Sequence, residues 1–284
     1  MKILFPNGKL QHIPQSNTWR YIVIDPRRFR SIAIHGFFLS LLISVTAAAD
    51  AQTGVKPERS PVLVELFTSE GCSSCPPADA FLGKLEHLQP VNGAKIIILG
   101  EHVDYWDKDG WRDRFSSPDY TQRQNEYATK LHVSDSYTPQ MIVDGSDQFL
   151  GSDSEHALKS ITTAAQTPKV GLTITNITVD GRHVSAEVSA PPFPFKGDLY
   201  AALVDPVDMT DVKKGENGGK HLEHAGVVRT MQRIGSLKDL AAGPRKFNLN
   251  APSDAVPGSM RVVVFAQRSD MGPIVGAAST PVTP

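Results

Sequence analysis

The segment LFTSEGCSSCPP, Leu66–Pro77, decides the fold of this chain. It holds both cysteines of the protein, Cys72 and Cys75. The apolar run at residues 61–67 leads into it and predicts a buried strand. Apolar residues that recur with the period of a helix follow it and predict a helix that ends near Gln89. The regular part of this helix should begin at Pro76. A Cys-x-x-Cys turn between a strand and a helix indicates a redox dithiol.

Two thiols at this spacing can close a small disulfide ring, and the positive end of the helix dipole favours the thiolate. Such surroundings lower a cysteine pKa from about 8.5 to roughly 3.5–7.5. We expect Cys72 to project outward as the nucleophile and Cys75 to resolve the mixed disulfide. Glu70 would oppose thiolate formation if its side chain pointed toward Cys72. The alternatives are a static disulfide, an inert thiol pair, and half of a zinc site, which the lack of a second cysteine pair disfavours.

The composition is that of a globular chain. It has 284 residues, 40% of them hydrophobic, and a net charge of −1. This length suits one large domain or two small ones. The charge gives no reason to expect nucleic acid or an anionic membrane as a partner.

Residues 26–51 have the pattern of a signal peptide. A basic region with Arg27, Arg28 and Arg30 precedes an apolar stretch, 32–45, that is too short to span a bilayer comfortably. A small-x-small cleavage site follows at 49–51. We therefore expect a periplasmic or secreted protein, in a compartment where a disulfide persists. The alternative is an uncleaved anchor, the only case in which a membrane is a partner. Residues 1–25 match no fold pattern, which leaves a start further downstream open.

The apolar run 94–100 is typical of a buried parallel strand. The polar and aromatic segment 101–111 and the Cys-x-x-Cys turn both follow strands at their carboxyl edge, so they should lie side by side. We expect His102 and Asp104 to transfer protons during exchange. Tyr105 and Trp106, together with Trp111, would form a wall that faces the substrate. The alternative for each residue is a packed loop that caps the sheet.

The rest of the first half predicts a helix over 118–130 capped by Ser117, a strand at 141–143 with a return strand, and a helix opened by a capping box from Ser152 to Glu155. Together these give strand, helix, strand, inserted helix, strand, strand, helix, the order of the thioredoxin fold. Thr138-Pro139 stands where such proteins keep a cis proline, facing the dithiol, excluding metal and presenting backbone groups to an extended substrate. An ordinary trans proline is the alternative.

Beyond Thr167-Pro168 the periodicity changes to short alternating strands with Pro- and Gly-rich turns, which predicts an antiparallel β-sandwich-like domain. We therefore divide the chain into an extension with signal peptide (1–51), a thioredoxin-like α/β domain with an inserted helix (60–167) and an all-β domain (168–284). The loop at 214–224 carries His221, Glu223 and His224. It could be a metal site, a mobile loop that reaches a partner or the first domain, or a plain surface loop.

Together these motifs resemble the exported thioredoxin-like proteins of domain-of-unknown-function family 1223. The likeness covers about residues 60–280 and is carried by five segments, 64–79, 102–106, 137–140, 215–219 and 227–229. It implies a thioredoxin-like domain with an appended all-β part, and it implies no activity. The Trp-Cys-Gly-Pro-Cys motif of thioredoxin itself is absent, and the region 101–131 is extra.

The favoured hypothesis is an exported thiol–disulfide oxidoreductase that acts on protein or peptide thiols and needs no cofactor or metal. Cys72 attacks, Cys75 resolves, and Thr138 and Pro139 shape the edge that receives the substrate. Two alternatives stay open: a periplasmic copper carrier that uses the thiolates and His102, and a binding scaffold with a vestigial dithiol. A Cys72 sealed from solvent, or a Pro139 far from both sulfurs, would contradict the first hypothesis.

Overall fold

An eight-stranded mixed sheet organises the part of the chain that this computed structural model describes, residues 59–192 and 194–283. Its strand order is β11-β10-β7-β8-β2-β1-β3-β4, and a second, antiparallel sheet has the order β5-β6-β9. The strands are β1 Ser60–Thr68, β2 Ala94–His102, β3 Gln140–Val143, β4 Asp147–Leu150, β5 Thr173–Asp180, β6 His183–Ser189, β7 Gly197–Asp211, β8 His221–Ser236, β9 Arg245–Asn250, β10 Arg261–Arg268 and β11 Ile274–Pro281. The helices are α1 Pro76–Leu88, α2 Pro118–Lys130 and α3 Ser154–Ala165, with short 3-10 helices at Leu237–Ala242 and Pro257–Ser259.

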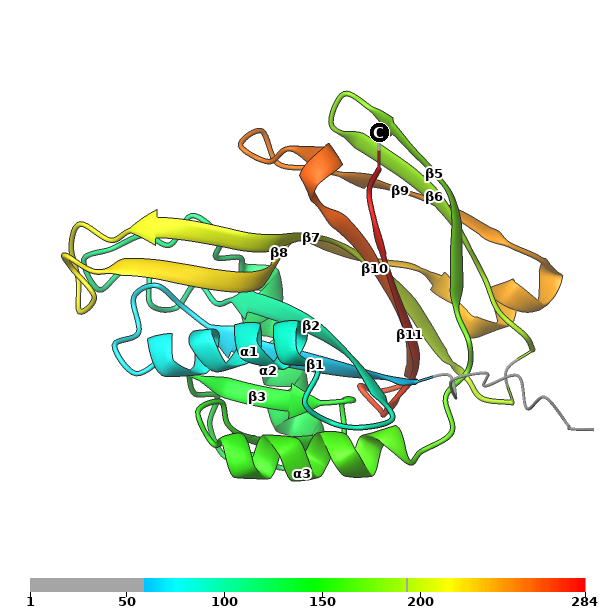
Figure 1. Cartoon of the computed structure of the whole chain (residues 1–284), viewed down its shortest axis with the longest axis horizontal. Helices are drawn as coiled ribbons and strands as arrows, with labels where there is room; N and C mark the ends of the chain where they lie inside the picture. The colour runs from blue at the N-terminus through cyan, green and yellow to red at the C-terminus, as the bar shows by residue number, and fades with distance from the viewer. Residues whose placement is uncertain (1–58, 193, 284) are drawn as a thin grey trace, which may run out of the picture. The chain divides into compact units, whose positions relative to one another are not determined.

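Helices cover both faces of the sheet around β1 and β2. These two strands are parallel, with Thr68 opposite His102, and β3 runs antiparallel to β1. Apolar side chains of α1 and α3 share one core with β1, β2 and β3, while α2 packs on the opposite face (Figure 1). This double cover explains why residues 62–68 are all buried and why the strand sequences are continuous apolar runs.

Local sequence rules set all three helix starts, and two of them agree with the prediction. The helix α1 begins at Pro76 and α2 at Pro118, where the Ser117 hydroxyl accepts a hydrogen bond from the Asp119 amide, as predicted. The predicted capping box from Ser152 to Glu155 is wrong. The carboxylate of Asp153 accepts from the His156 amide instead, and α3 therefore begins at Ser154.

One sheet runs through both halves of the chain. β8 pairs in parallel with β2 at Gly100 and Val227, which joins β7, β8, β10 and β11 to β1–β4. The close approach needs a small residue, because a Cβ on Gly226 would lie 2.7 Å from Cγ1 of Ile98. The expected boundary at Thr167-Pro168 lies in the connection from α3 to β5, but the strands beyond it extend the first sheet instead of building a separate sandwich. The described residues all fall within one unit, Val55–Pro284.

The second sheet packs against the outer part of the first. Inward residues of β6 and β9, such as Val188 and Phe247, share a core with Leu203 of β7 and Val264 of β10. The antiparallel strands expected after residue 168 are therefore present, and they stack on strands of the large sheet. Within the described ranges, no helix has the length and apolar content needed to cross a membrane. The predicted extension and signal peptide, 1–51, lie outside these ranges.

Candidate functional site

The turn between β1 and α1 holds a disulfide. Cys72 and Cys75 are bonded to each other, and their Cα atoms are 5.4 Å apart. The amide of Cys75 donates to the carbonyl of Cys72, and the carbonyl of Cys75 accepts from Ala78, the first bond of the helix. The sulfur pair therefore lies where the positive end of the α1 dipole acts. We call residues 69–75 the Cys turn.

Both cysteines are sealed from solvent. Their exposed fraction is 0%, whereas Ser73 and Ser74 between them are exposed. The expectation that Cys72 projects outward is therefore wrong for this oxidised state. A segment far along the chain and a tryptophan of the predicted aromatic loop cover the turn.

The covering segment is the loop between β7 and β8, Val212–Lys220, which we call the covering loop. The side-chain amide of Asn217, itself fully buried, donates to the carbonyl oxygens of Glu70 and Cys72, both at 2.9 Å. The carboxylate of Glu216 accepts from the Ser73 amide at 3.1 Å, and its bonds to Ser73 lower the pKa of Glu216. Three interpretations of the loop at 214–224 were open: a metal site, a loop that reaches a partner or the first domain, and a plain surface loop. The structure shows a loop that contacts the first half of the chain.

The aromatic loop after β2 covers the other side of the turn. A Cβ on Gly71 would lie 3.0 Å from Cβ of Trp106, whose indole N–H donates to the hydroxyl of Thr138 at 2.9 Å. The indole of Trp111 donates to the Glu70 carboxylate at 2.6 Å. The predicted contact between this loop and the Cys turn is thus confirmed, and Trp106 and Thr138 meet. Tyr105 instead directs its hydroxyl to Gln124 of α2, at 3.3 Å.

Pro139 lies over the first turn of α1. The Thr138–Pro139 peptide bond is cis, as predicted. A Cβ on Gly151 would lie 3.1 Å from both Cβ of Pro139 and Cβ of Ala78, so these two side chains flank one narrow space. Ala78 belongs to the helical turn that follows Cys75, which places the proline beside the start of that helix.

The surroundings of His102 and Asp104 differ from those expected of two side chains that transfer protons at the dithiol. His102 is the last residue of β2, only 1% exposed, and its Nδ1 is 2.6 Å from Oδ2 of Asp113. Burial by itself would lower the pKa of His102, but the charge and hydrogen bond of Asp113 raise it, and the same contact lowers the pKa of Asp113. Asp104 accepts a hydrogen bond from the Thr121 hydroxyl of α2 at 2.6 Å. The carboxylate of Asp104 is thus held against α2.

Sequence reasoning missed two residues beside His102, namely Asp79 and Asp113, and it assigned the third, His224, to a loop with His221. The rings of His102 and His224 lie 4.8 Å apart, edge to face. His224 is buried on β8, while His221 is exposed and pairs with Asp211, so the two histidines do not share a site. Within 59–192 and 194–283, no three His, Cys, Asp or Glu side chains are placed so that they could hold one metal ion together. One sequence signal existed: Asp79 is an acidic residue four positions after Cys75, on the same helix face.

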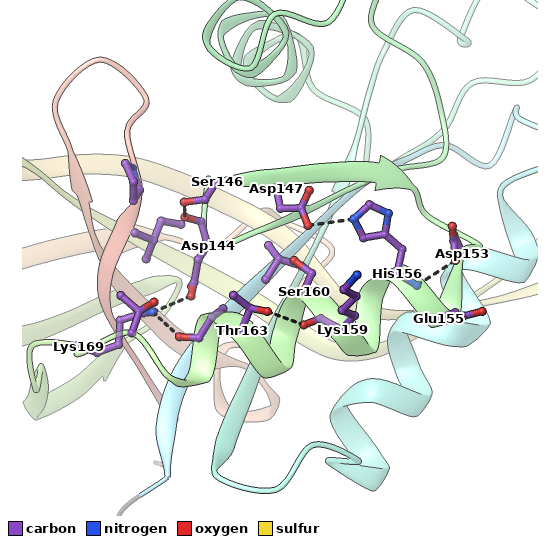
Figure 2. A pocket seen from close by; sticks show the side chains of 15 residues that line it. Asp144, Ser146, Asp147, Asp153, Glu155, His156, Lys159, Ser160, Thr163 and Lys169 are labelled. Atoms are coloured by element: carbon purple, nitrogen blue, oxygen red, sulfur yellow. Dashed lines mark hydrogen bonds and ion pairs between the residues drawn. The ribbon is translucent and has the colours of Figure 1, made fainter. Parts of the chain in front are cut away.

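A separate cavity of about 640 Å³ lies between the β3–β4 turn and α3. Two ion pairs lie among its lining residues, Lys169 with Asp144 at 2.8 Å and His156 with Asp147 at 3.0 Å. Figure 2 shows both pairs as dashed lines. Burial raises the pKa of Asp144 to about 6, although Lys169 opposes the shift. None of the lining residues belongs to the Cys turn, so this cavity is separate from the disulfide.

Fold and site together define a mixed α/β protein with a buried Cys-x-x-Cys disulfide at the start of a helix. Residues 63–267 match the family described as protein of unknown function (DUF1223), and the chain belongs to that family. No curated protein matches the chain.

Among solved structures, the chain is similar to protein AGR_C_4864 from Agrobacterium tumefaciens, known from a crystal structure. The identity is 28% and the TM-score 0.60, over 80% of this chain and 96% of that one. A domain of the outer membrane lipoprotein Omp28 from Porphyromonas gingivalis matches at 10% identity and a TM-score of 0.26, over 41% of this chain and 97% of that one. The latter match is too weak to support an argument.

Proposed function

We propose that this protein is an exported thiol–disulfide oxidoreductase that acts on protein or peptide thiols in the periplasm or outside the cell. The observation that carries the proposal is the Cys72–Cys75 disulfide at the first turn of α1. The path β1-α1-β2-α2-β3-β4-α3, with strand order β2-β1-β3-β4, supports a thioredoxin-like arrangement of residues 60–167. The Trp106–Thr138 contact supports a substrate edge beside the turn.

The reaction is a two-step exchange. A partner thiolate attacks Sγ of Cys72, the Cys72–Cys75 bond breaks, and the Cys75 sulfur leaves and takes up a proton. A second partner thiol, after losing its proton, attacks the partner sulfur of this mixed disulfide. The partner disulfide forms, and the Cys72 sulfur is released as a thiolate that can be protonated. The net reaction reduces the protein disulfide and oxidises two partner thiols, and the reverse path oxidises the protein.

The burial of Cys72 is the condition that the sequence analysis sets against this function, and it excludes exchange in the closed conformation. The mechanism therefore has a further requirement. A partner sulfur must approach Cys72 along the disulfide bond, and in the closed conformation no path reaches the atom. The covering loop is the segment whose displacement opens one, because Glu216 bonds to the exposed Ser73 and Asn217 bonds to Cys72. We therefore propose that exchange proceeds from an open state of the covering loop.

The same burial favours a second candidate, a binding scaffold in which the disulfide only fixes the Cys turn. A disulfide with no exposed atom resists reduction unless the structure opens. In that case the covering loop and the disulfide would form one structural unit, and reduction would occur only when the protein unfolds.

A glutathione redox titration of the native protein separates the two candidates. We expect reversible reduction and oxidation while near-UV circular dichroism reports a folded protein. A Cys75→Ser variant should accumulate a mixed disulfide with glutathione at Cys72, and Cys72→Ser should form none. Reduction that follows global unfolding alone would support the scaffold. Fractionation of cells, with N-terminal sequencing of the mature chain, tests export.

A further inference from the structure

Five ionisable side chains lie together beneath the Cys turn. They come from five different segments, and each is 5% exposed or less; they are Glu70, Asp79, His102, Asp113 and His224. We call them the acid–imidazole cluster. Because buried charges are costly unless they are paired, a group of this size indicates either a closed network of bonds or a store of protons.

The network is only partly closed. His102 and Asp113 form a tight pair, and Asp79 accepts a hydrogen bond from the Thr68 hydroxyl at 2.8 Å. The ring of His224 stands between two carboxylates without bonding to either: Nδ1 is 3.7 Å from Asp79 and Nε2 is 3.6 Å from Glu70. Both nitrogens of His224 and Oε1 of Glu70 have no hydrogen-bond partner. A purely structural network would close these bonds, since an unpaired buried polar group is destabilising.

The cluster is connected to both cysteines. Asp79 follows Cys75 by four residues on α1, so the two side chains lie on one helix face, and the Asp79 amide donates to the Cys75 carbonyl at 3.1 Å. Glu70 precedes Cys72 by two residues, and Asn217 binds the carbonyls of both. The carboxyl of Asp79 therefore stands on the inner side of the Cys turn, away from the exposed Ser73 and Ser74.

Burial raises the pKa of Asp79, while the nearby His224 and His102 oppose the shift. Asp113 acts in the same direction as burial. The Thr68 hydroxyl donates a hydrogen bond to the Asp79 carboxylate, which lowers the pKa of Asp79. The pKa of His102 is raised by Asp113, Asp79 and Glu70 against the effect of burial. Protons are thus held in the cluster at a pH where exposed carboxylates have lost them.

We infer that Asp79, with His224 beside it, supplies the proton that the Cys75 sulfur takes up when the disulfide is reduced, and accepts it again on oxidation. This rests on the proposed oxidoreductase function. When the partner thiolate breaks the Cys72–Cys75 bond, the electron pair goes to Sγ of Cys75. That sulfur is sealed from water, so a buried thiolate would be strongly disfavoured. Transfer of the Asp79 proton leaves a neutral thiol and a carboxylate, whose charge the imidazole of His224 stabilises.

The test measures the rate of disulfide reduction by dithiothreitol from pH 5 to pH 9, divided by the thiolate fraction of the reductant. In the native protein this corrected rate should fall as the pH rises, because Asp79 loses the proton that it donates. Asp79→Asn should make the corrected rate independent of pH and reduce it roughly ten- to a hundred-fold at low pH. Asp180→Asn, an exposed change on the β5–β6 turn, is the matched control and should follow the native profile.

His224→Gln is a second variant that keeps Asp79 in place. If Asp79→Asn does not fold, His224→Gln tests the inference by itself. Because His224 lowers the pKa of Asp79, its loss should move the fall in corrected rate to higher pH. A uniform decrease at every pH in either variant, with a lower urea midpoint, would mean that the cluster is structural and would overturn the inference. If the native protein is not reduced at all while folded, the oxidoreductase proposal fails as well, and the two failures are thereby distinguished.

Discussion

Asn217 and Cys72, which are 145 positions apart in the chain, are joined by a hydrogen bond of 2.9 Å from a side-chain amide to a main-chain carbonyl. The same amide binds the carbonyl of Glu70. A residue of the β7–β8 connection therefore fixes the position of the disulfide turn that follows β1. This relationship makes access to the cysteines a property of both halves of the chain.

Asn217→Ala should increase the rate at which glutathione reduces the disulfide. The change removes both donated bonds, so the Glu70 carbonyl loses this partner and the Cys72 carbonyl keeps only the Cys75 amide, which destabilises the closed loop by about 1–3 kcal/mol. Since about 1.4 kcal/mol corresponds to a factor of ten, the open state and the reduction rate should rise roughly ten-fold. The rate is measured by trapping free thiols with an alkylating reagent under native conditions.

Lys213→Ala is the control for this loop. Lys213 is 69% exposed and its side chain pairs with the exposed Asp211 at 3.4 Å, so the variant should be reduced at the native rate. Equal rates in the native protein and Asn217→Ala would show that the covering loop does not limit access to Cys72.

Lys169→Met should destabilise the protein in a pH-dependent way. The pKa of Asp144 is raised to about 6, so the stability that its protonated form provides is present below about pH 4 and is lost as the pH rises through 6. Lys169, 4% exposed and 2.8 Å away, limits this loss because it pairs with the carboxylate. Without it we expect a small change at pH 4.5 and a loss of about 3 kcal/mol at pH 8, measured by urea unfolding.

Lys159→Met, in the same cavity, provides the comparison. Lys159 is exposed on α3, and its removal should change the free energy of unfolding by less than about 0.5 kcal/mol at either pH. A loss in Lys169→Met of the same size at pH 4.5 and pH 8 would rule out the Asp144 pair as its cause.

Gly226→Ala tests the contact that joins the two halves of the large sheet. Gly226 has a φ of 64°, and an added Cβ would lie 2.7 Å from Cγ1 and 3.2 Å from the carbonyl of Ile98. Backbone strain and overpacking together should reduce the unfolding free energy by about 2–4 kcal/mol. Gly181→Ala has a similar φ, 58°, but open space around it, and should lose only about 1–2 kcal/mol. Equal losses would mean that the β2–β8 contact can relax.

Much of the region around the cysteines could be predicted because it follows local rules. Pro76 and Pro118 occupy first helical positions, Ser117 caps a helix, and the cis peptide bond falls at Thr138–Pro139, as expected. The contact between the loop after β2 and the Cys turn follows from two parallel strands that end at the same edge. Each of these inferences needs only neighbouring residues or one strand pair.

The buried parts of the site could not be predicted in the same way. Cys72 is covered by Asn217, and no periodic pattern connects two residues at that separation. The sequence predicts a loop at His102, but β2 extends to His102, which lies opposite Thr68 of β1. The side chain of His102 is therefore buried against Asp113. His224 enters the cluster only because β8 joins β2, a contact that depends on Gly100 and Gly226.

Arg123→Met should be more destabilising than the other changes, because Arg123 is the cation of a buried network. It is 2.6 Å from Glu65 and 3.7 Å from Glu101, both 0% exposed. Burial and Glu65 raise the pKa of Glu101 well above its usual range, and Arg123 opposes this shift. The stability that protonated Glu101 provides is therefore lost as the pH rises. Without the arginine this loss of stability should be larger. We expect a loss of about 3–5 kcal/mol at pH 8 and less at pH 5, by urea unfolding, with Arg123→Lys intermediate because it keeps the charge.

If Arg123→Lys lost as much as Arg123→Met, the fork of hydrogen bonds to Glu65 and Tyr127 would be the stabilising feature, and the charge would not.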